Sequence, residues 1–111
     1  MNMAHEIVDG KLVITVNEQR IDAASAVEFK DAVRDVTREG SGPVILDLSQ
    51  VEFLDSSGLG AVVASMKLLG PDRPLELANL SPGVAKVFRL TRMDSIFTIH
   101  GADGEGVARA V

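Results

Sequence analysis

The strongest constraint on the fold is a short, almost entirely apolar run at residues 44–48, directly after Pro43. Nearly continuous runs of Val, Ile and Leu of this length are typical of a central strand that is covered on both faces. Apolar residues recur at helical spacing on either side of the run, over residues 23–39 and again over residues 59–69. A buried strand between two amphipathic helices predicts an α/β fold.

The N-terminal part of the chain predicts a hairpin followed by the first helix. Residues 7–8 and 13–16 have the composition of two short strands, and the turn Asp9-Gly10 favours a tight connection between them. Asp22 is placed to cap the helix that follows. The chain therefore opens with two strands and one amphipathic helix.

The C-terminal half adds two strands, at residues 75–78 and 96–99, with a third helix between them. Ser81 is the expected N-cap of this helix and Pro82 its first residue. Its expected inner face consists of Val84, Val87, Phe88 and Leu90. The order β-β-α-β-α-β-α-β predicts a single α/β domain with a largely parallel or mixed sheet. Residues 101–111 contain too few large apolar side chains to specify more than a weak terminal helix or tail.

Composition and charge exclude several classes of function. The net charge of -5 would repel a nucleic-acid backbone, and the absence of Trp and Tyr removes the usual platforms for base stacking. The absence of Cys excludes disulfides, thiolate metal sites and a Cys nucleophile. The longest apolar stretch, residues 59–66, is too short to span a bilayer, and the N-terminus lacks the features of a signal peptide. We expect a cytoplasmic protein without membrane insertion, metal or cofactor.

The turn between the central strand and the second helix holds the candidate functional residues. Asp55-Ser56-Ser57-Gly58 places two hydroxyls at a helix start, where α/β sheets form binding crevices. One serine can cap the helix, so we assign Ser57 to the cap and Ser56 to function. Gly58 and Gly60 each cost a helix up to about 1 kcal/mol relative to Ala. Two explanations stay open for them: close packing of the helix, or a bare surface that a partner can approach.

Residues 46–60, with the sequence LDLSQVEFLDSSGLG, resemble the signature of the STAS domain of bacterial anti-sigma factor antagonists. Residues 20–22 and 90–97 agree with this resemblance, which extends over about residues 7–99. It implies a single STAS-like domain with a mixed sheet and helices packed mainly on one side. In that family the serine directly after the Asp is phosphorylated by an anti-sigma factor that is also a serine kinase, and this serine corresponds to Ser56.

The resemblance implies a protein-binding switch. The unphosphorylated form binds the anti-sigma factor and so frees the sigma factor, phosphorylation of Ser56 ends the binding, and a serine phosphatase resets the cycle. The nucleotide and Mg²⁺ belong to the kinase partner. The partner-binding residues are expected to be Asp22, Asp55, Ser57, Gly58, Leu59 and Gly60. Gln19 and Arg92 depart from the pattern, because the family often has Gly at these two positions.

Two other functions are alternatives to the antagonist. A hydrolase with Ser56 as nucleophile would need a positioned base, but His5 and His100 flank the predicted sheet and no G-x-S-x-G elbow is present. We therefore expect no enzyme activity and no catalytic residue. STAS domains also occur in lipid or anion transporters and in larger signalling assemblies, and this alternative stays open.

Several of the polar residues have a structural explanation beside the functional one. Asp55 can act as a turn or cap carboxylate, and Asp47 can accept hydrogen bonds at the end of the central strand. The stripe of Leu59, Val62, Val63 and Met66 predicts core packing. A short basic face on the third helix is more often solvated than used for docking; it consists of Lys86, Arg89 and Arg92.

Overall fold

The computed structural model describes residues 1–101, so the expected terminal segment at 102–111 lies outside the described residues. The main sheet has the order β1 (Met3–Val8), β2 (Lys11–Val16), β4 (Val44–Asp47), β6 (Leu75–Ala78) and β7 (Ile99–His100). β1 pairs with β2 in antiparallel orientation, and the other neighbours pair in parallel. The α/β class and the mixed sheet are confirmed.

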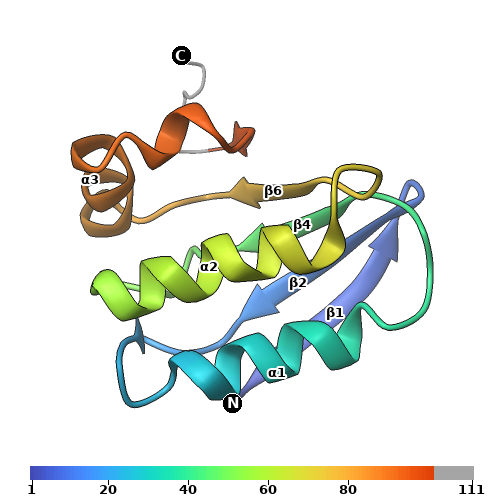
Figure 1. Ribbon diagram of the computed structural model, residues 1–111, viewed down its shortest axis with the longest axis horizontal. Coiled ribbons are helices and arrows are strands. Elements are labelled where there is room, and N and C mark those ends of the chain that lie inside the picture. Colours follow the sequence, from blue (N-terminus) through green and yellow to red (C-terminus); the bar gives the residue numbers. More distant parts are fainter. Residues whose placement is uncertain (102–111) are drawn as a thin grey trace.

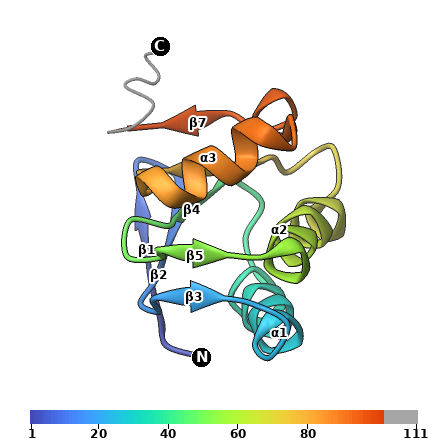
Figure 2. The ribbon, with the colours of Figure 1, turned by 90° about the vertical axis from the view of Figure 1, so that its left-hand side faces the viewer.

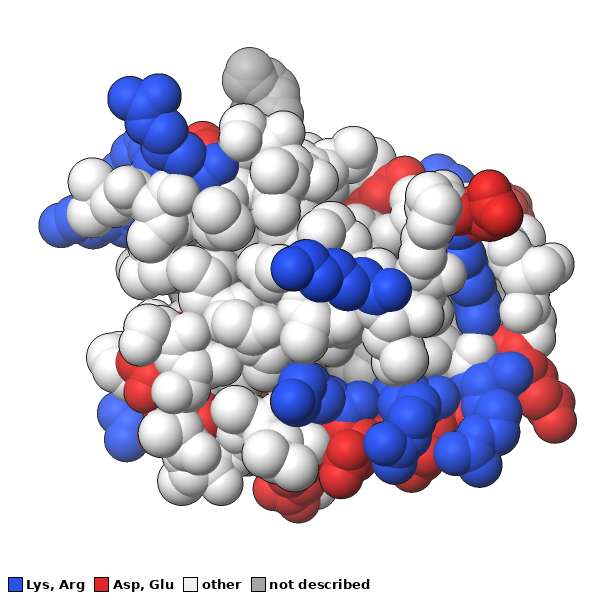
Figure 3. Space-filling view, viewed as in Figure 1, with Lys and Arg blue, Asp and Glu red and all other residues white. Residues whose placement is uncertain are grey.

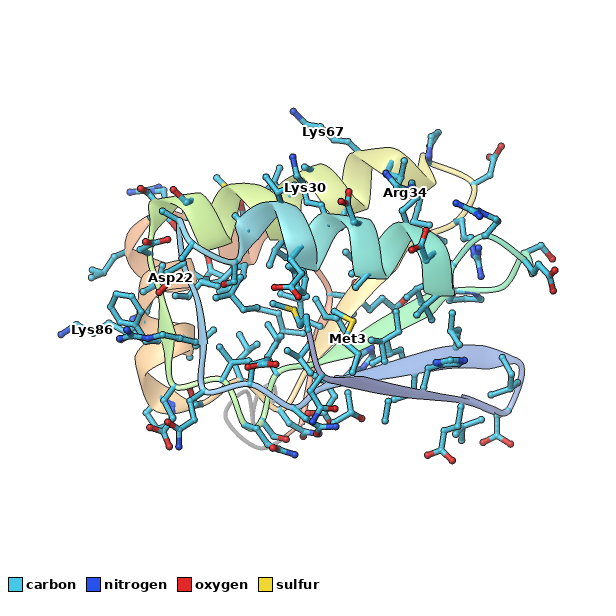
Figure 4. All side chains as sticks on the ribbon, turned by 90° about the horizontal axis from the view of Figure 1, so that it is seen from below. Met3, Asp22, Lys30, Arg34, Lys67 and Lys86 are labelled. Atoms are coloured by element: carbon cyan, nitrogen blue, oxygen red, sulfur yellow. The ribbon has the colours of Figure 1, made fainter. Side chains whose placement is uncertain are left out.

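The two long helices lie side by side over one face of this sheet (Figures 1 and 4). They are α1 (Ala26–Val36) and α2 (Ser56–Leu69), and both start at the same end of the molecule. The third helix, α3 (Pro82–Leu90), lies at that end too, and is followed by the short 3-10 helix η1 (Met93–Ser95). Packing of the helices mainly on one side is therefore confirmed.

The core lies between this sheet face and the helices. Along β2 every second side chain is buried, and in β4 Val44 and Leu46 are fully buried while Ile45 is only half-buried. The prediction that the central strand is covered on both faces is therefore wrong. A continuous apolar run cannot distinguish the two cases, because a half-covered strand can carry Ile on its outer face as well.

An aromatic contact joins helix α3 to the segment between η1 and β7. Phe88 and Phe97 pack edge to face with their ring centroids 5.8 Å apart, and both are buried. Ser81 caps the helix as expected, since its hydroxyl oxygen accepts from the Val84 N–H. Leu90, however, is 70% exposed, so its predicted inward position is wrong. The helix ends at this residue, and the turn into η1 leaves its side chain outside the core.

The start of α1 differs from the prediction. The helix begins at Ala26 rather than Ala23, and its N-cap position is Ser25, not Asp22. The Asp22 carboxylate makes its hydrogen bonds before the helix begins: it accepts from the Ala24 N–H at 3.1 Å and from the Ser25 hydroxyl at 3.3 Å. These bonds stabilise a turn before the helix instead of the helix itself.

Two short strands lie in segments for which the sequence predicts no strand. β3 (Arg20–Ile21) and β5 (Phe53–Leu54) pair in parallel and form a small second sheet (Figure 2). The last predicted strand is also displaced, because Ile96 is the C-cap of η1 and β7 starts only at Ile99. Strands of two residues are too short to show an alternating pattern.

The two departures from the family's glycines have different consequences. Gln19 has no positive φ, and its carbonyl accepts from the N–H groups of Glu52 and Phe53 at the entry to β3 and β5. Arg92 adopts the left-handed conformation, with φ 61° and ψ 18°. A residue with a Cβ is destabilised there by roughly 1–2 kcal/mol.

Candidate functional site

The small sheet of β3 and β5 brings two distant segments to one edge of the molecule. Ile21 pairs with Leu54, so the next residues along the two strands are Asp22 and Asp55. The Ala23 N–H then donates to Asp55 Oδ2 at 3.2 Å, which fastens the loop before α1 to the start of α2. We call Asp22, Asp55 and Ser56 the switch rim.

Asp55, not Ser57, caps helix α2. Its backbone is extended, and its Oδ1 accepts from the Gly58 N–H at 2.9 Å. The assignment of Ser57 to the cap is therefore wrong, because the cap position lies one residue before the two serines. Both carboxylate oxygens of Asp55 accept backbone N–H bonds, and this is its structural role at the turn.

The consequence is that neither serine is needed for capping. The side chains of Ser56 and Ser57 are exposed, and within residues 1–101 neither hydroxyl makes a hydrogen bond. Capping therefore does not distinguish the two serines. Their surroundings do, since Ser56 lines a surface hollow and Ser57 does not.

This hollow lies between α2 and η1 and is about 420 Å³ in volume. We call it the α2 hollow. Its wall is largely apolar, and Ser56 and Lys67 are the two residues with polar side chains that line it. It is lined by Ser56, Leu59, Gly60, Val63, Ala64, Lys67 and Met93. An open apolar surface beside an unpaired hydroxyl is suited to contact with another protein.

The structure assigns a different reason to each glycine of α2. A Cβ on Gly58 would lie 2.1 Å from the Ile21 carbonyl oxygen, so Gly58 permits the close approach of α2 to β3. Gly58 is itself buried, so it is not part of the exposed surface of α2. A Cβ on Gly60 would meet nothing within 4 Å. Only Gly60 fits the explanation of a bare surface.

The apolar stripe of α2 is divided between the core and the hollow. Val62 is fully buried as predicted, whereas Leu59, Val63 and Met66 are only partly buried at the edge of the core. The innermost positions are instead taken by small residues, Gly58, Ala61 and Ser65. The prediction of a core role is thus confirmed for Val62, while Leu59 and Val63 also face the hollow.

Three residues near the rim and the hollow were not predicted as site residues from the sequence. The Arg20 guanidinium lies over the Phe53 ring, 4.9 Å from its centroid, and Phe53 is 45% exposed. Met93 closes the far wall of the α2 hollow. The signal for Phe53 is its alternation with the buried Leu54, but that signal has meaning only once β5 is recognised as a strand.

The other polar candidates lie elsewhere. Asp47 accepts from the Ser49 N–H at 2.9 Å and from the Asn79 amide at 3.0 Å, which confirms its structural role. His5 is on β1 and His100 on β7, the two edges of the main sheet, and His100 Nε2 lies 2.7 Å from Glu76 Oε1.

The described part of the chain holds neither a metal-binding cluster nor a membrane-spanning helix. Residues 1–101 contain no cluster of three or more His, Asp or Glu side chains suited to hold a metal ion. Within the same residues no helix has the length and hydropathy needed to cross a membrane.

These features define a small α/β domain in which Asp55 caps the start of α2 and Ser56 beside it stays exposed. The model of the STAS domain family matches residues 2–105, so the chain belongs to the STAS domain family. An anti-sigma-B factor antagonist of Listeria monocytogenes is 34% identical over 87 residues, which are 77% of this chain and 75% of that protein.

Solved structures show the same fold. An anti-sigma factor antagonist from Mycobacterium paratuberculosis superposes with a TM-score of 0.79 at 25% identity, over 98% of this chain and 92% of that one. The anti-sigma factor antagonist SpoIIAA in its unphosphorylated form gives a TM-score of 0.69 at 22% identity, over 97% and 95%. SpoIIAA has also been solved in the phosphorylated form, with a TM-score of 0.63 at 21% identity, over 97% and 98% of the two chains. The SpoIIAA likeness shows the fold alone.

Proposed function

We propose that this chain is an anti-sigma factor antagonist whose binding is controlled by phosphorylation of Ser56. In the unphosphorylated state it binds an anti-sigma factor with serine kinase activity, and the sigma factor is released. Transfer of a phosphoryl group to Ser56 ends this binding, and a serine phosphatase restores it. The cycle takes place in the cytoplasm.

The observation that carries this proposal is the capping of α2 by Asp55. Because Asp55 Oδ1 accepts from the Gly58 N–H, the Ser56 hydroxyl stays exposed and without a partner in the described chain. Ser56 also lines the α2 hollow, together with Leu59 and Gly60 one turn further along the helix. A partner seated on the hollow would cover Ser56 directly.

The effect of a phosphate follows from charge. A phosphoserine adds about -1.5 to -2 charges at neutral pH. Here the charge would appear beside the carboxylates of Asp22 and Asp55, at the start of α2. The helix N-terminus tolerates an anion, which it stabilises by roughly 0.3–1 kcal/mol, so the domain itself stays folded. An apolar or acidic partner surface does not tolerate it.

The proposed role is that of a binding regulator and not of an enzyme. Both oxygens of Asp55 are occupied by backbone N–H groups, and the two histidines lie at the edges of the main sheet. Neither arrangement provides a base for Ser56. In this proposal the nucleotide and its Mg²⁺ are supplied by the kinase partner, and no nucleic acid binds directly.

The test uses Ser56 and Ser57 as matched positions. The purified protein is incubated with ATP and each anti-sigma factor kinase of the same genome, and the phosphate is located by mass spectrometry. Ser56→Ala should abolish the modification and preserve binding. Ser56→Asp should weaken binding more than about a hundredfold, equivalent to roughly 3 kcal/mol, in a calorimetric titration.

Ser57→Ala and Ser57→Asp are the controls, because Ser57 is also exposed but does not line the hollow. We expect Ser57→Ala to leave phosphorylation unchanged and Ser57→Asp to weaken binding by less than about tenfold, or roughly 1.4 kcal/mol. Label on Ser57 with Ser56 unmodified, or equal effects of the two Asp variants, would contradict the proposal.

A further inference from the structure

A second surface of the domain carries positive charge that the switch does not use. Lys86 and Arg89 on α3 and Arg92 after it are exposed, and none of them makes an ion pair with another residue of the 1–101 segment. Asp94 is the one acidic residue in the stretch from 82 to 95. Figure 3 shows Lys and Arg side chains gathered over α3 and η1, at the upper left. This basic face contrasts with the net charge of -5 of the chain.

Arg34 in α1 and Arg38 just after it are different in this respect. Arg34 contacts Asp31 at 3.2 Å and Asp35 at 3.6 Å, and Arg38 contacts Asp35 at 3.1 Å. The charge of both arginines is largely balanced by these neighbouring carboxylates, as in an ordinary solvated face. The basic face of α3 has no comparable acidic partners in the described structure, so it keeps its charge available for another molecule.

Arg92 adds a second, independent observation. It occupies a left-handed position that Gly would adopt without strain, and its backbone carbonyl accepts from the Ser95 N–H and hydroxyl. Gly could make the same backbone bonds. The side chain is therefore what this residue adds at the position, and strained residues of this kind are concentrated at functional sites.

Large apolar side chains accompany the cations. Leu90 is 70% exposed and Ile96 is 46% exposed, and both flank Arg92 along the chain. Arg together with exposed apolar groups is the composition of a protein-binding surface. A nucleic-acid backbone would use the cations but not the two apolar side chains.

We propose that the basic face of Lys86, Arg89 and Arg92, with Leu90 and Ile96, binds an acidic segment of a partner protein. Lys86 projects from the end of the molecule where Asp22 and the start of α2 also lie (Figure 4). One partner can therefore contact both the switch rim and this face. The proposal does not depend on phosphorylation, because the charges of α3 are present in either state of Ser56.

The test measures binding of a fluorescein-labelled twelve-residue peptide of alternating Glu and Leu by fluorescence anisotropy, in low and in moderate salt. Lys86→Glu/Arg89→Glu should weaken binding at least tenfold. The matched control is Lys30→Glu/Lys67→Glu, which changes the net charge equally on the outer side of α1 and α2 (Figure 4). We expect the control to weaken binding less than threefold, and added salt to weaken binding of the wild type.

Two single variants separate docking from folding. Arg92→Gly should raise the melting temperature, because the left-handed strain is removed, and yet weaken peptide binding about threefold or more. Leu90→Ser should weaken binding without changing its salt dependence, because the lost contact is apolar. Both residues are exposed, so both variants should fold.

Four results would overturn the proposal. Equal weakening by the two double variants would show a mere effect of net charge, and no weakening by either would show that the peptide binds elsewhere. Tighter binding of phosphatidylglycerol vesicles or of a short DNA duplex would assign the face to another kind of partner. Self-association that Lys86→Glu/Arg89→Glu abolishes, with no peptide binding, would assign it to a second copy of the chain.

Discussion

The starts of α2 and α3 are built alike but differ in how they use serine. Each helix has a glycine in its first turn that lies close to a backbone carbonyl, Gly58 to Ile21 and Gly83 to Glu52. In α3 the cap is Ser81, whose hydroxyl accepts from the Val84 N–H and donates to the Val51 carbonyl at 2.7 Å. In α2 the cap is Asp55.

The difference shows what makes a serine available at a helix start. The Ser81 hydroxyl both accepts and donates a hydrogen bond within the fold, so its role is structural. The hydroxyls of Ser56 and Ser57 are not needed for capping, because the Asp55 carboxylate already accepts from the Gly58 N–H. Availability for modification is therefore determined by Asp55 rather than by the serines themselves.

The largest effect is expected from filling the space at the first glycine. Gly58→Ala would place a Cβ 2.1 Å from the Ile21 carbonyl oxygen, and should lower the free energy of unfolding by about 2–3 kcal/mol. Urea unfolding measures this loss. Gly83→Ala is the matched control, because its Cβ would lie 3.0 Å from the Glu52 carbonyl oxygen.

For Gly83→Ala we expect a change within about 1 kcal/mol, since the gain in helix propensity offsets the tight contact. If the two variants lost equal stability, the close approach of α2 to β3 would have no special importance.

An intermediate effect is expected from removing the cap of α2. Asp55→Ala should lower the free energy of unfolding by about 1–2 kcal/mol, because the bonds from Gly58 and Ala23 are lost together. Asp55→Asn keeps an acceptor oxygen and should lose less. Thermal and urea unfolding of both variants give the comparison.

A double variant tests whether a serine can replace the missing cap. If Asp55→Ala costs less than about 0.5 kcal/mol but Asp55→Ala/Ser57→Ala costs the full amount, Ser57 has taken over the cap. Both helices could then be capped by a serine, and the difference between α2 and α3 would be smaller. Equal losses of unfolding free energy in the single and double variants would confirm that Asp55 alone caps α2.

The smallest effect is expected at Gly60, and it has the opposite sign. Gly60→Ala should stabilise the domain by about 0.5–1 kcal/mol, because a Cβ there meets no atom within 4 Å and Ala favours the helix. Binding of the anti-sigma factor should weaken, since the methyl group enters the α2 hollow. Unchanged binding in a stabilised variant would show that the partner does not approach α2 at Gly60.

The sequence alone was enough to predict the α/β class, the hairpin at Asp9-Gly10, the central position of β4 and the capping of α3 by Ser81. These features depend on residues close together in the chain, on period, turn chemistry and capping, so local physical rules determine them. The same rules marked the Asp55-Ser56-Ser57-Gly58 turn as a candidate site. They assigned the cap to the wrong residue, because several neighbouring side chains can each accept the same N–H bond.

Only the tertiary structure decided which side chain caps α2 and which glycine of that helix has space for a side chain. Pairing of β3 with β5 brings Ala23 to Asp55, and the nearby Ile21 carbonyl leaves no space for a side chain on Gly58. Gly60 is open because no other segment comes within 4 Å of a Cβ placed there. Contacts between segments some thirty residues apart decide these points. Sequence spacing contains no information about them, because each depends on where a second segment lies in space.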